Sequence, residues 1–216
     1  MRFSKNYLNL FLIISLAFML PSNSKAAPTP SPTLASPKLI AAPKGSTPPN
    51  YEISFNKSGK TSIDIWEDFQ CANCAKFHTT NGDFISKVIS DGKIKINFHI
   101  LSFLGADSVV LANAAACAAD EGKFLPAHAQ LFKLQSENKN SGIWTNEFLQ
   151  TKMAEVGIGS TKFNKCIENK KYLKWVSAVQ KTATNSRILA TPTVLINGKA
   201  INRATDYYNS VSFESV

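Results

Sequence analysis

The alternation of apolar and polar residues predicts three strands in the first half of the chain. Residues 51–55 form a short apolar stretch before the turn-like segment 56–59, and residues 61–69 form a longer, more apolar one. Residues 93–101 have the period of two that is typical of a strand with one buried face. Ile94, Ile96, Phe98 and Ile100 are expected to lie on one face of that third strand.

A helical pattern separates and follows these strands. One helix should begin at Cys71, be interrupted near Asn81–Gly82 and end at Asp91–Gly92, where glycine favours a helix C-terminus. Thr145 and Ser160 are suited to capping later helices. The helices expected beyond the third strand cover residues 108–121, 125–134, 145–157, 160–167 and 172–188.

The last part of the chain predicts a hairpin followed by a short helix. Two apolar runs, 193–196 and 199–202, flank Asn197–Gly198, and an Asn-Gly pair in that position is a strong signal for a tight hairpin turn. The order strand, helix, strand, helical block, hairpin and helix predicts one α/β domain over residues 51–216. The helical block, about 105–190, is an insertion within that domain.

The N-terminal segments have a different character. Residues 1–26 resemble a secretory signal peptide, with an early positive charge, an apolar stretch and a small-x-small cleavage pattern that ends at Ala26. An uncleaved membrane anchor is the alternative. Residues 27–50 are rich in proline and predict an extended linker or a disordered tail. No cysteine precedes Cys71, which excludes a lipid attachment near the cleavage site.

The positive charge of the chain is dispersed. The net charge is +9, and loss of Arg2, Lys5 and Lys25 with the signal peptide would lower it to +6. Because the lysines are scattered, we interpret them as a solvated surface that favours an anionic cell envelope and not as a nucleic-acid site.

The motif Cys71-Ala72-Asn73-Cys74 carries the clearest chemistry. Two cysteines two residues apart at a helix start can form a reversible redox pair, and the helix dipole favours the thiolate of Cys71. Cys74, one turn deeper, would resolve a mixed disulfide. A purely structural role is the alternative, but a loop this short adds little stability when it is closed.

Cys117 and Cys166 form the second pair of cysteines. Each lies in an expected helix of the insertion, and in an exported protein we expect a structural disulfide between them. The alternative is two free thiols that pack as small apolar residues.

The three histidines offer weaker signals. His78 lies four residues after Cys74, so a zinc site of Cys71, Cys74 and His78 is conceivable, but it lacks a fourth ligand at suitable spacing. We therefore expect no metal and treat His78 as a surface histidine. His99 and His128, which have no evident partner in the sequence, are expected to be packing or surface residues.

Three sequence blocks carry a resemblance to a known family. They are Asp68 to Cys74, Ala115 to Phe124, and Ala190-Thr191-Pro192-Thr193-Val194, in this order along the chain. Together with the order of elements, they resemble the DsbA-like thiol:disulfide oxidoreductases, which have a thioredoxin fold with an inserted helical subdomain. The resemblance implies that Pro192 is a cis-proline facing the active disulfide and that Thr191 pairs with a substrate chain. An ordinary trans proline at a strand start is the alternative.

The resemblance also bears on how the redox potential is tuned. Ala72 and Asn73 occupy the tuning positions between the cysteines, where the strongest oxidants of the family have a histidine. The family frequently has an acidic residue six positions before the first cysteine, and this chain has Ile65 there. Asp64, Glu67 and Asp68 are close in sequence but lie in other registers.

The resulting hypothesis is an exported disulfide oxidase that needs no bound cofactor. Its expected substrates are unfolded exported proteins with cysteine pairs, and the resemblance implies reoxidation by a quinone-linked membrane partner. The alternatives are a reductase or isomerase on the same fold, or a non-catalytic peptide-binding module. A binding module would keep its affinity for peptides after both active-site cysteines are changed to serine.

Overall fold

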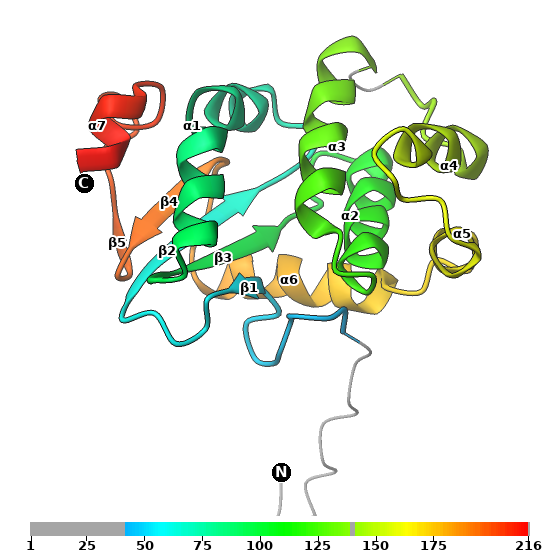
Figure 1. The fold of residues 1–216 in the computed structure, drawn as a ribbon, viewed down its shortest axis with the longest axis horizontal. Coiled ribbons are helices and arrows are strands. Elements are labelled where there is room, and N and C mark those ends of the chain that lie inside the picture. The colour runs from blue at the N-terminus through cyan, green and yellow to red at the C-terminus, as the bar shows by residue number, and fades with distance from the viewer. Residues whose placement is uncertain (1–41, 139–140, 216) are drawn as a thin grey trace, which may run out of the picture. The chain divides into compact units, whose positions relative to one another are not determined.

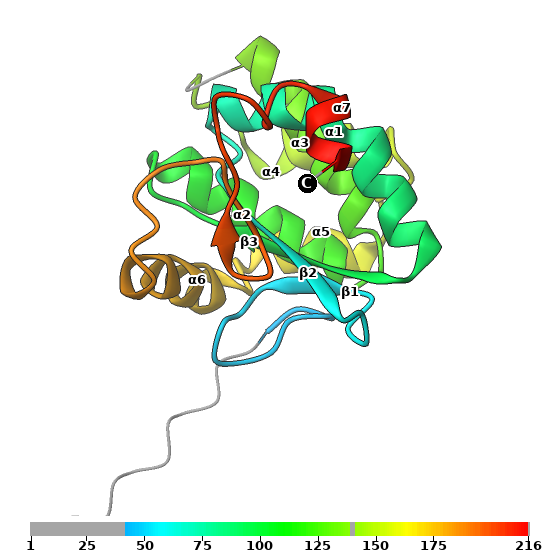
Figure 2. The same ribbon diagram turned by 90° about the vertical axis from the view of Figure 1, so that its left-hand side faces the viewer.

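A computed structural model describes residues 42–138 and 141–215, which form a mixed sheet with helices on both faces (Figures 1 and 2). Among the described residues, no helix is both long and apolar enough to span a membrane. The strands are β1 (Ile53–Phe55), β2 (Thr61–Glu67), β3 (Ile94–Ile100), β4 (Thr193–Ile196) and β5 (Lys199–Ala200). The helices are α1 (Ala72–Asp91), α2 (Ala106–Ala119), α3 (Phe124–Asn138), α4 (Asn146–Ala154), α5 (Thr161–Glu168), α6 (Leu173–Asn185) and α7 (Ser210–Ser215).

The sheet has the strand order β1-β3-β2-β4-β5, and β2 lies at its centre. Strands β2 and β3 run parallel and are joined by α1, whereas β1, β4 and β5 pair antiparallel with their neighbours. Ile65 of β2 pairs with Phe98 of β3 on one side and with Val194 of β4 on the other. All three side chains are buried, so the middle of β2 forms the centre of the core.

The helices divide between the two faces of the sheet. Figure 2 shows α1 and α7 on one face and α6 on the opposite face. Between β3 and β4, the chain forms α2 to α6, which contain the insertion predicted from the sequence. An α/β fold with a helical insertion is therefore confirmed.

The expected interruption of α1 near Asn81–Gly82 is wrong, because the helix is continuous over its 20 residues. Asn81 is buried, and its side-chain amide donates to the carbonyl oxygens of Phe77 and Tyr207. This residue therefore attaches α1 to the segment before α7. Gly92 ends the helix in a left-handed conformation (φ 74°), as the sequence predicts.

The packed part of the chain begins earlier than residue 51. Ser46 forms a β-bridge with Ile53, and its hydroxyl oxygen accepts a hydrogen bond of 2.8 Å from the indole of Trp175. The backbone N–H of Lys44 donates to Asp120. Residues 42–50 therefore pack against the domain, which corrects the linker boundary expected at residue 50. The expected signal peptide and residues 27–41 of the expected linker lie outside the described residues.

Candidate active site

The structure places the two cysteines of the motif at the start of α1, one turn after the end of β2. Cys71 is the N-cap residue, and its carbonyl oxygen accepts from the backbone N–H groups of Cys74 at 3.0 Å and Ala75 at 3.1 Å. Both cysteines are free thiols. Cys71 is partly exposed and Cys74 is fully buried, so only the first sulfur is accessible to a second molecule.

Asp68 holds the turn that connects β2 to Cys71. Its backbone carbonyl accepts from the Cys71 N–H at 2.9 Å, and its buried carboxylate accepts from the Ser108 hydroxyl at 2.7 Å and from the Gln70 N–H at 2.8 Å. Burial raises the pKa of Asp68, and the nearby Cys71 thiolate adds to the shift. The turn is thereby fixed to α2, the first helix of the insertion.

The environment separates the acidities of the two thiols. The side chain of Cys74 hydrogen-bonds the Cys71 sulfur and is the largest cause that lowers the pKa of Cys71 to about 5, although burial opposes the shift. The side chain of Thr191 and the backbone N–H groups of Cys74 and Asn73 lower this pKa further. Burial raises the pKa of Cys74 far above its ordinary value. The Cys71 thiolate and the Glu67 carboxylate raise it further. At neutral pH the reduced pair therefore consists of a thiolate at Cys71 and a thiol at Cys74.

Of the two residues between the cysteines, Asn73 acts on Cys71 through its backbone. Ala72 and Asn73 are exposed. The backbone N–H of Asn73 contributes to the lowered pKa of Cys71. The residue at the second tuning position therefore acts through the geometry of the first helical turn.

The segment Thr191–Pro192 lies against the cysteines although it is far from them in sequence. The Thr191–Pro192 peptide bond is cis, and the Thr191 carbonyl oxygen lies 3.5 Å from the Cys71 sulfur. Arg203 donates to the same carbonyl at 3.2 Å and to the carbonyl of Pro192 at 2.5 Å. The guanidinium of Arg203 also lies over the ring of Tyr207. Sequence analysis did not single out Arg203, because one arginine in the segment after β5 carries no signal of its own.

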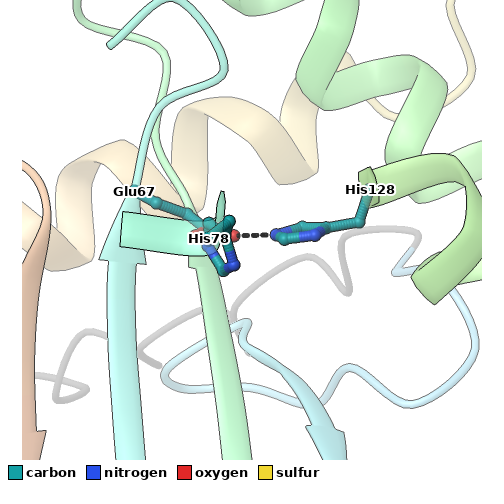
Figure 3. Close-up of side chains that lie close together, drawn as sticks. All are labelled: Glu67, His78 and His128. Atoms are coloured by element: carbon teal, nitrogen blue, oxygen red, sulfur yellow. Dashed lines mark hydrogen bonds and ion pairs between the residues drawn. The ribbon is translucent and has the colours of Figure 1, made fainter. Parts of the chain in front are cut away.

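Behind the cysteines, a fully buried carboxylate lies between two imidazoles (Figure 3). Glu67, the last residue of β2, accepts a hydrogen bond from Nε2 of His128 at 2.6 Å through one oxygen, and its other oxygen pairs with Nε2 of His78. Burial alone would raise the pKa of Glu67, but the two imidazoles outweigh it and hold this pKa at about 2. Burial lowers the pKa of His128.

These contacts correct the surface position expected for His78, and they give His99 and His128, which are buried, partners that the sequence did not indicate. His78 of α1 and His128 of α3 are not surface or simple packing residues, because they are the hydrogen-bond partners of Glu67. His99 also has a partner: its ring stacks on Trp66 and its Nε2 lies 3.2 Å from the carboxylate of Asp64. The available signal was the four-residue spacing of His78 from Cys74, which places both on one face of a helix.

Glu67 also corrects the interpretation of the missing acidic residue. Side chains of a strand alternate between its two faces, so Glu67 and Ile65 lie on the same face of β2. The acidic residue is therefore present on the same face of β2, two residues closer to Cys71 than in the family pattern. Its charge reaches Cys74, as the raised pKa of that thiol indicates.

Cys117 and Cys166 form a disulfide that joins α2 to α5, with a sequence separation of 49 residues. Both residues are buried. This disulfide therefore connects two helices of the insertion.

Comparisons with known proteins agree with this geometry. Residues 56–212 match the model of the family described as Thioredoxin. The structure is similar to MdbA, a thiol-disulfide oxidoreductase from Actinomyces oris, with a TM-score of 0.72, 26% identity and coverage of 87% of this chain and 94% of that one. It is also similar to DsbA from Mycobacterium tuberculosis, with a TM-score of 0.58, 26% identity and coverage of 76% and 82%.

A third structure supports the fold alone. BdbD from Bacillus subtilis has a TM-score of 0.64 at 19% identity, with coverage of 82% of this chain and 96% of that one. No curated protein sequence shows a significant match to the chain. Since the family model spans most of the described domain, the chain belongs to the thioredoxin family, as a DsbA-like member with an inserted helical subdomain.

Proposed function

We propose that this protein is an exported disulfide oxidase that introduces disulfides into secreted proteins through the Cys71–Cys74 pair. The class of thiol:disulfide oxidoreductase follows from the family and from the relatives with that activity. The direction of electron flow is our inference. Export is supported by the signal-like segment at residues 1–26.

The difference in acidity between the two thiols carries the proposal for the direction. A pKa of about 5 at Cys71 means that the reduced enzyme exists as a stabilised thiolate at neutral pH. Whatever stabilises the reduced form makes the disulfide form a stronger oxidant. A reductase would need the opposite bias, in which the disulfide form is favoured.

The reaction proceeds in two exchange steps. A substrate thiolate attacks the Cys71 sulfur of the oxidised enzyme, which breaks the Cys71–Cys74 bond, and Cys74 leaves and takes up a proton because of its high pKa. The second substrate thiolate then attacks the substrate sulfur of the mixed disulfide and releases Cys71 as a thiolate. The substrate loses two electrons and two protons, of which one proton remains on Cys74 and one enters solvent.

The loop opposite Cys71 positions the substrate chain in this proposal. Thr191 presents its backbone beside the reacting sulfur, and Arg203 holds the carbonyls of Thr191 and Pro192. An extended substrate segment can pair with such a backbone as an added strand does. In this view Thr191 and Pro192 act on substrate, whereas Arg203 is a positioning residue.

The partners follow from the same chemistry. The substrates are unfolded exported proteins with pairs of cysteines, and turnover requires an acceptor for the two electrons. As for the DsbA-like proteins, we infer a quinone-linked membrane protein in this role. No bound cofactor takes part in the exchange itself.

The redox potential of the Cys71–Cys74 pair tests the direction. The pair should be equilibrated with glutathione buffers, and its reduced fraction read by thiol alkylation and mass shift. A potential of about −180 mV or higher is expected for an oxidase. A value near −270 mV, that of thioredoxin, would instead identify a reductase.

A second test separates catalysis from simple peptide binding. Cys74→Ser leaves Cys71 able to attack a substrate disulfide but removes the thiol that resolves the product, so mixed disulfides should accumulate on non-reducing gels. The double variant Cys71→Ser and Cys74→Ser should lose oxidative refolding of a reduced substrate. Unchanged peptide affinity in that double variant, with no refolding activity in the wild type, would establish a binding module.

A further inference from the structure

We propose that Glu67, His78 and His128 form a binding site for a divalent transition-metal ion, with Zn²⁺ as the expected occupant. The three residues come from β2, α1 and α3, so the site would connect the sheet, the active-site helix and the insertion. One ligand atom from each of them lies within 4.8 Å of the others. The proposal is independent of the direction of electron flow at the cysteines.

The donor set is of the type that binds zinc. Two imidazole nitrogens and one carboxylate oxygen, with a water molecule in the fourth position, form a common tetrahedral arrangement. Zinc binds such atoms at about 2.0–2.2 Å, so neighbouring ligand atoms lie about 3.4 Å apart. The His128 Nε2 and the Glu67 oxygen are now 2.6 Å apart, and an opening of roughly 0.8 Å makes room for the ion.

The orientation of the two imidazoles supports the same assignment. Both present Nε2 to the carboxylate of Glu67, and their ring planes are nearly perpendicular at 82° with centroids 4.4 Å apart (Figure 3). The rings therefore approach one point from two directions and do not stack on one another. Metal binding needs each ring to be neutral, with its proton on Nδ1 so that the Nε2 lone pair is available.

The burial of Glu67 gives a reason for a cation at this point. A carboxylate that is fully removed from water is costly unless it is paired or coordinates a metal. In the structure its oxygens are held by two imidazoles. Zn²⁺ would replace these hydrogen bonds with stronger charge compensation.

Space and surroundings also fit a metal site. A cavity of about 460 Å³ between α1 and α3 is lined by both His78 and His128, which leaves room for a water ligand and a path for the ion. Phenylalanine rings pack around the two imidazoles, and such an apolar shell limits the access of solvent to a bound ion. These rings are Phe69, Phe98, Phe124 and Phe132.

The test uses the oxidised full-length protein, in which the disulfide prevents Cys71 and Cys74 from binding zinc. After treatment with a chelator, Zn²⁺ is titrated by calorimetry, and one saturable site per chain is expected. His128→Gln and His78→Gln keep a side chain of similar polarity but lack the ligand nitrogen. Each should weaken binding by at least ~100-fold, because loss of an outer-shell partner alone costs 10–100-fold.

His99→Gln is the matched control, because His99 is a buried histidine paired with a carboxylate outside this group. It should bind Zn²⁺ as the wild type does. Circular dichroism establishes that each variant is folded, and if His128→Gln is not, the less buried His78→Gln decides. With Co²⁺, the wild type should show the visible absorption of a tetrahedral ion without a thiolate charge-transfer band.

Three results would overturn the proposal. The first is the lack of a saturable site in the oxidised wild type. The second is binding that survives in both His78→Gln and His128→Gln. The third is binding that appears only after reduction and carries a thiolate band, which would assign the metal to Cys71 and Cys74.

Discussion

The two cysteine pairs of this protein show how one residue type acquires opposite properties from two environments. Cys71 and Cys74 are three positions apart at a helix start, and they are free thiols of very different acidity. Cys117 and Cys166 are 49 residues apart, buried between α2 and α5, and joined. The first pair lies beside a loop that a second molecule can approach, and the second pair is enclosed in the insertion.

Exposure and hydrogen bonding decide how reactive a cysteine thiol is, whereas the length of the closed loop decides how much a disulfide stabilises the fold. The backbone N–H groups at the start of α1 and the neighbouring thiol stabilise a thiolate at Cys71. The disulfide of the buried pair closes a long loop. Its loss should therefore raise the conformational entropy of the unfolded chain more than the loss of the Cys71–Cys74 disulfide does. The following predictions test this division, beginning with the largest effect.

Cys71→Ser should abolish oxidative refolding of a reduced multi-cysteine substrate, with a loss of at least ~1,000-fold, the scale expected when a nucleophile is removed. The matched control is the double variant Cys117→Ser and Cys166→Ser, assayed where it remains folded. That control should keep most of the activity. Equal losses in both variants would contradict the separation of the two pairs.

Removal of the buried disulfide should have the larger effect on stability. Replacing both Cys117 and Cys166 by serine should lower the free energy of unfolding by about 4 kcal/mol, because the bond closes a loop of this length. Urea unfolding of the oxidised proteins measures the loss. The double variant Cys71→Ser and Cys74→Ser, which opens only a short loop, should lose ~2 kcal/mol or less. The division fails if the active-site variant is the less stable of the two.

The alkylation of Cys71 should remain fast at acidic pH. With a pKa of about 5, the thiol is mostly ionised at pH 6, and after allowance for the weaker nucleophilicity of an acidic thiolate the rate should exceed that of an ordinary cysteine by about tenfold. Iodoacetamide labelling followed by peptide mapping measures the rate from pH 4 to pH 9. Preferential labelling of Cys74, or a midpoint near pH 8, would reverse the assignment.

The lowered pKa of Cys71 also makes the stability of the reduced protein depend on pH. The folded pKa of Cys71 is lower than the unfolded value, so the thiolate stabilises the reduced folded protein fully above about pH 9, and this contribution is lost as the pH falls through about 5. The oxidised protein has no such thiolate. The difference in stability between reduced and oxidised protein should therefore grow between pH 5 and pH 9.

The smallest expected effect concerns the loop beside Cys71. Arg203→Gln should slow refolding of the substrate about fivefold, because it weakens hydrogen bonds of about 1 kcal/mol to the carbonyls of Thr191 and Pro192. The effect should appear in KM more than in kcat, since the residue positions the loop that receives the substrate. Lys199→Gln, an exposed change on the neighbouring β5, is the control. An identical effect of the two variants would mean that only surface charge matters.

The elements with regular patterns were predicted well, for local reasons. The alternation in residues 93–101 and the Asn197–Gly198 pair lead to β3 and to the turn between β4 and β5. Thr145 and Ser160 accept hydrogen bonds at the starts of α4 and α5, as their residue type predicts. Such features depend on neighbours in sequence, so the sequence contains the information that is needed.

The interruption of α1 and the linker boundary were mispredicted because distant contacts override local preference. Asn81 is a weak helix former, yet its amide is held by Phe77 and Tyr207. Ser46 lies in a proline-rich segment, yet it is fixed by Ile53 and Trp175. Tyr207 and Trp175 are 126 and 129 residues away from these positions in sequence.

The sequence by itself determined which pair of cysteines is the candidate reactive group, because a Cys-x-x-Cys motif at a helix start needs only local geometry and the helix dipole. Only the tertiary structure decided what surrounds that pair. Glu67, His78 and His128 come from a strand and two helices, and their meeting depends on how these elements pack. A side chain acquires its charge and its partners from the groups that folding brings next to it, and for a buried carboxylate those groups lie on other elements.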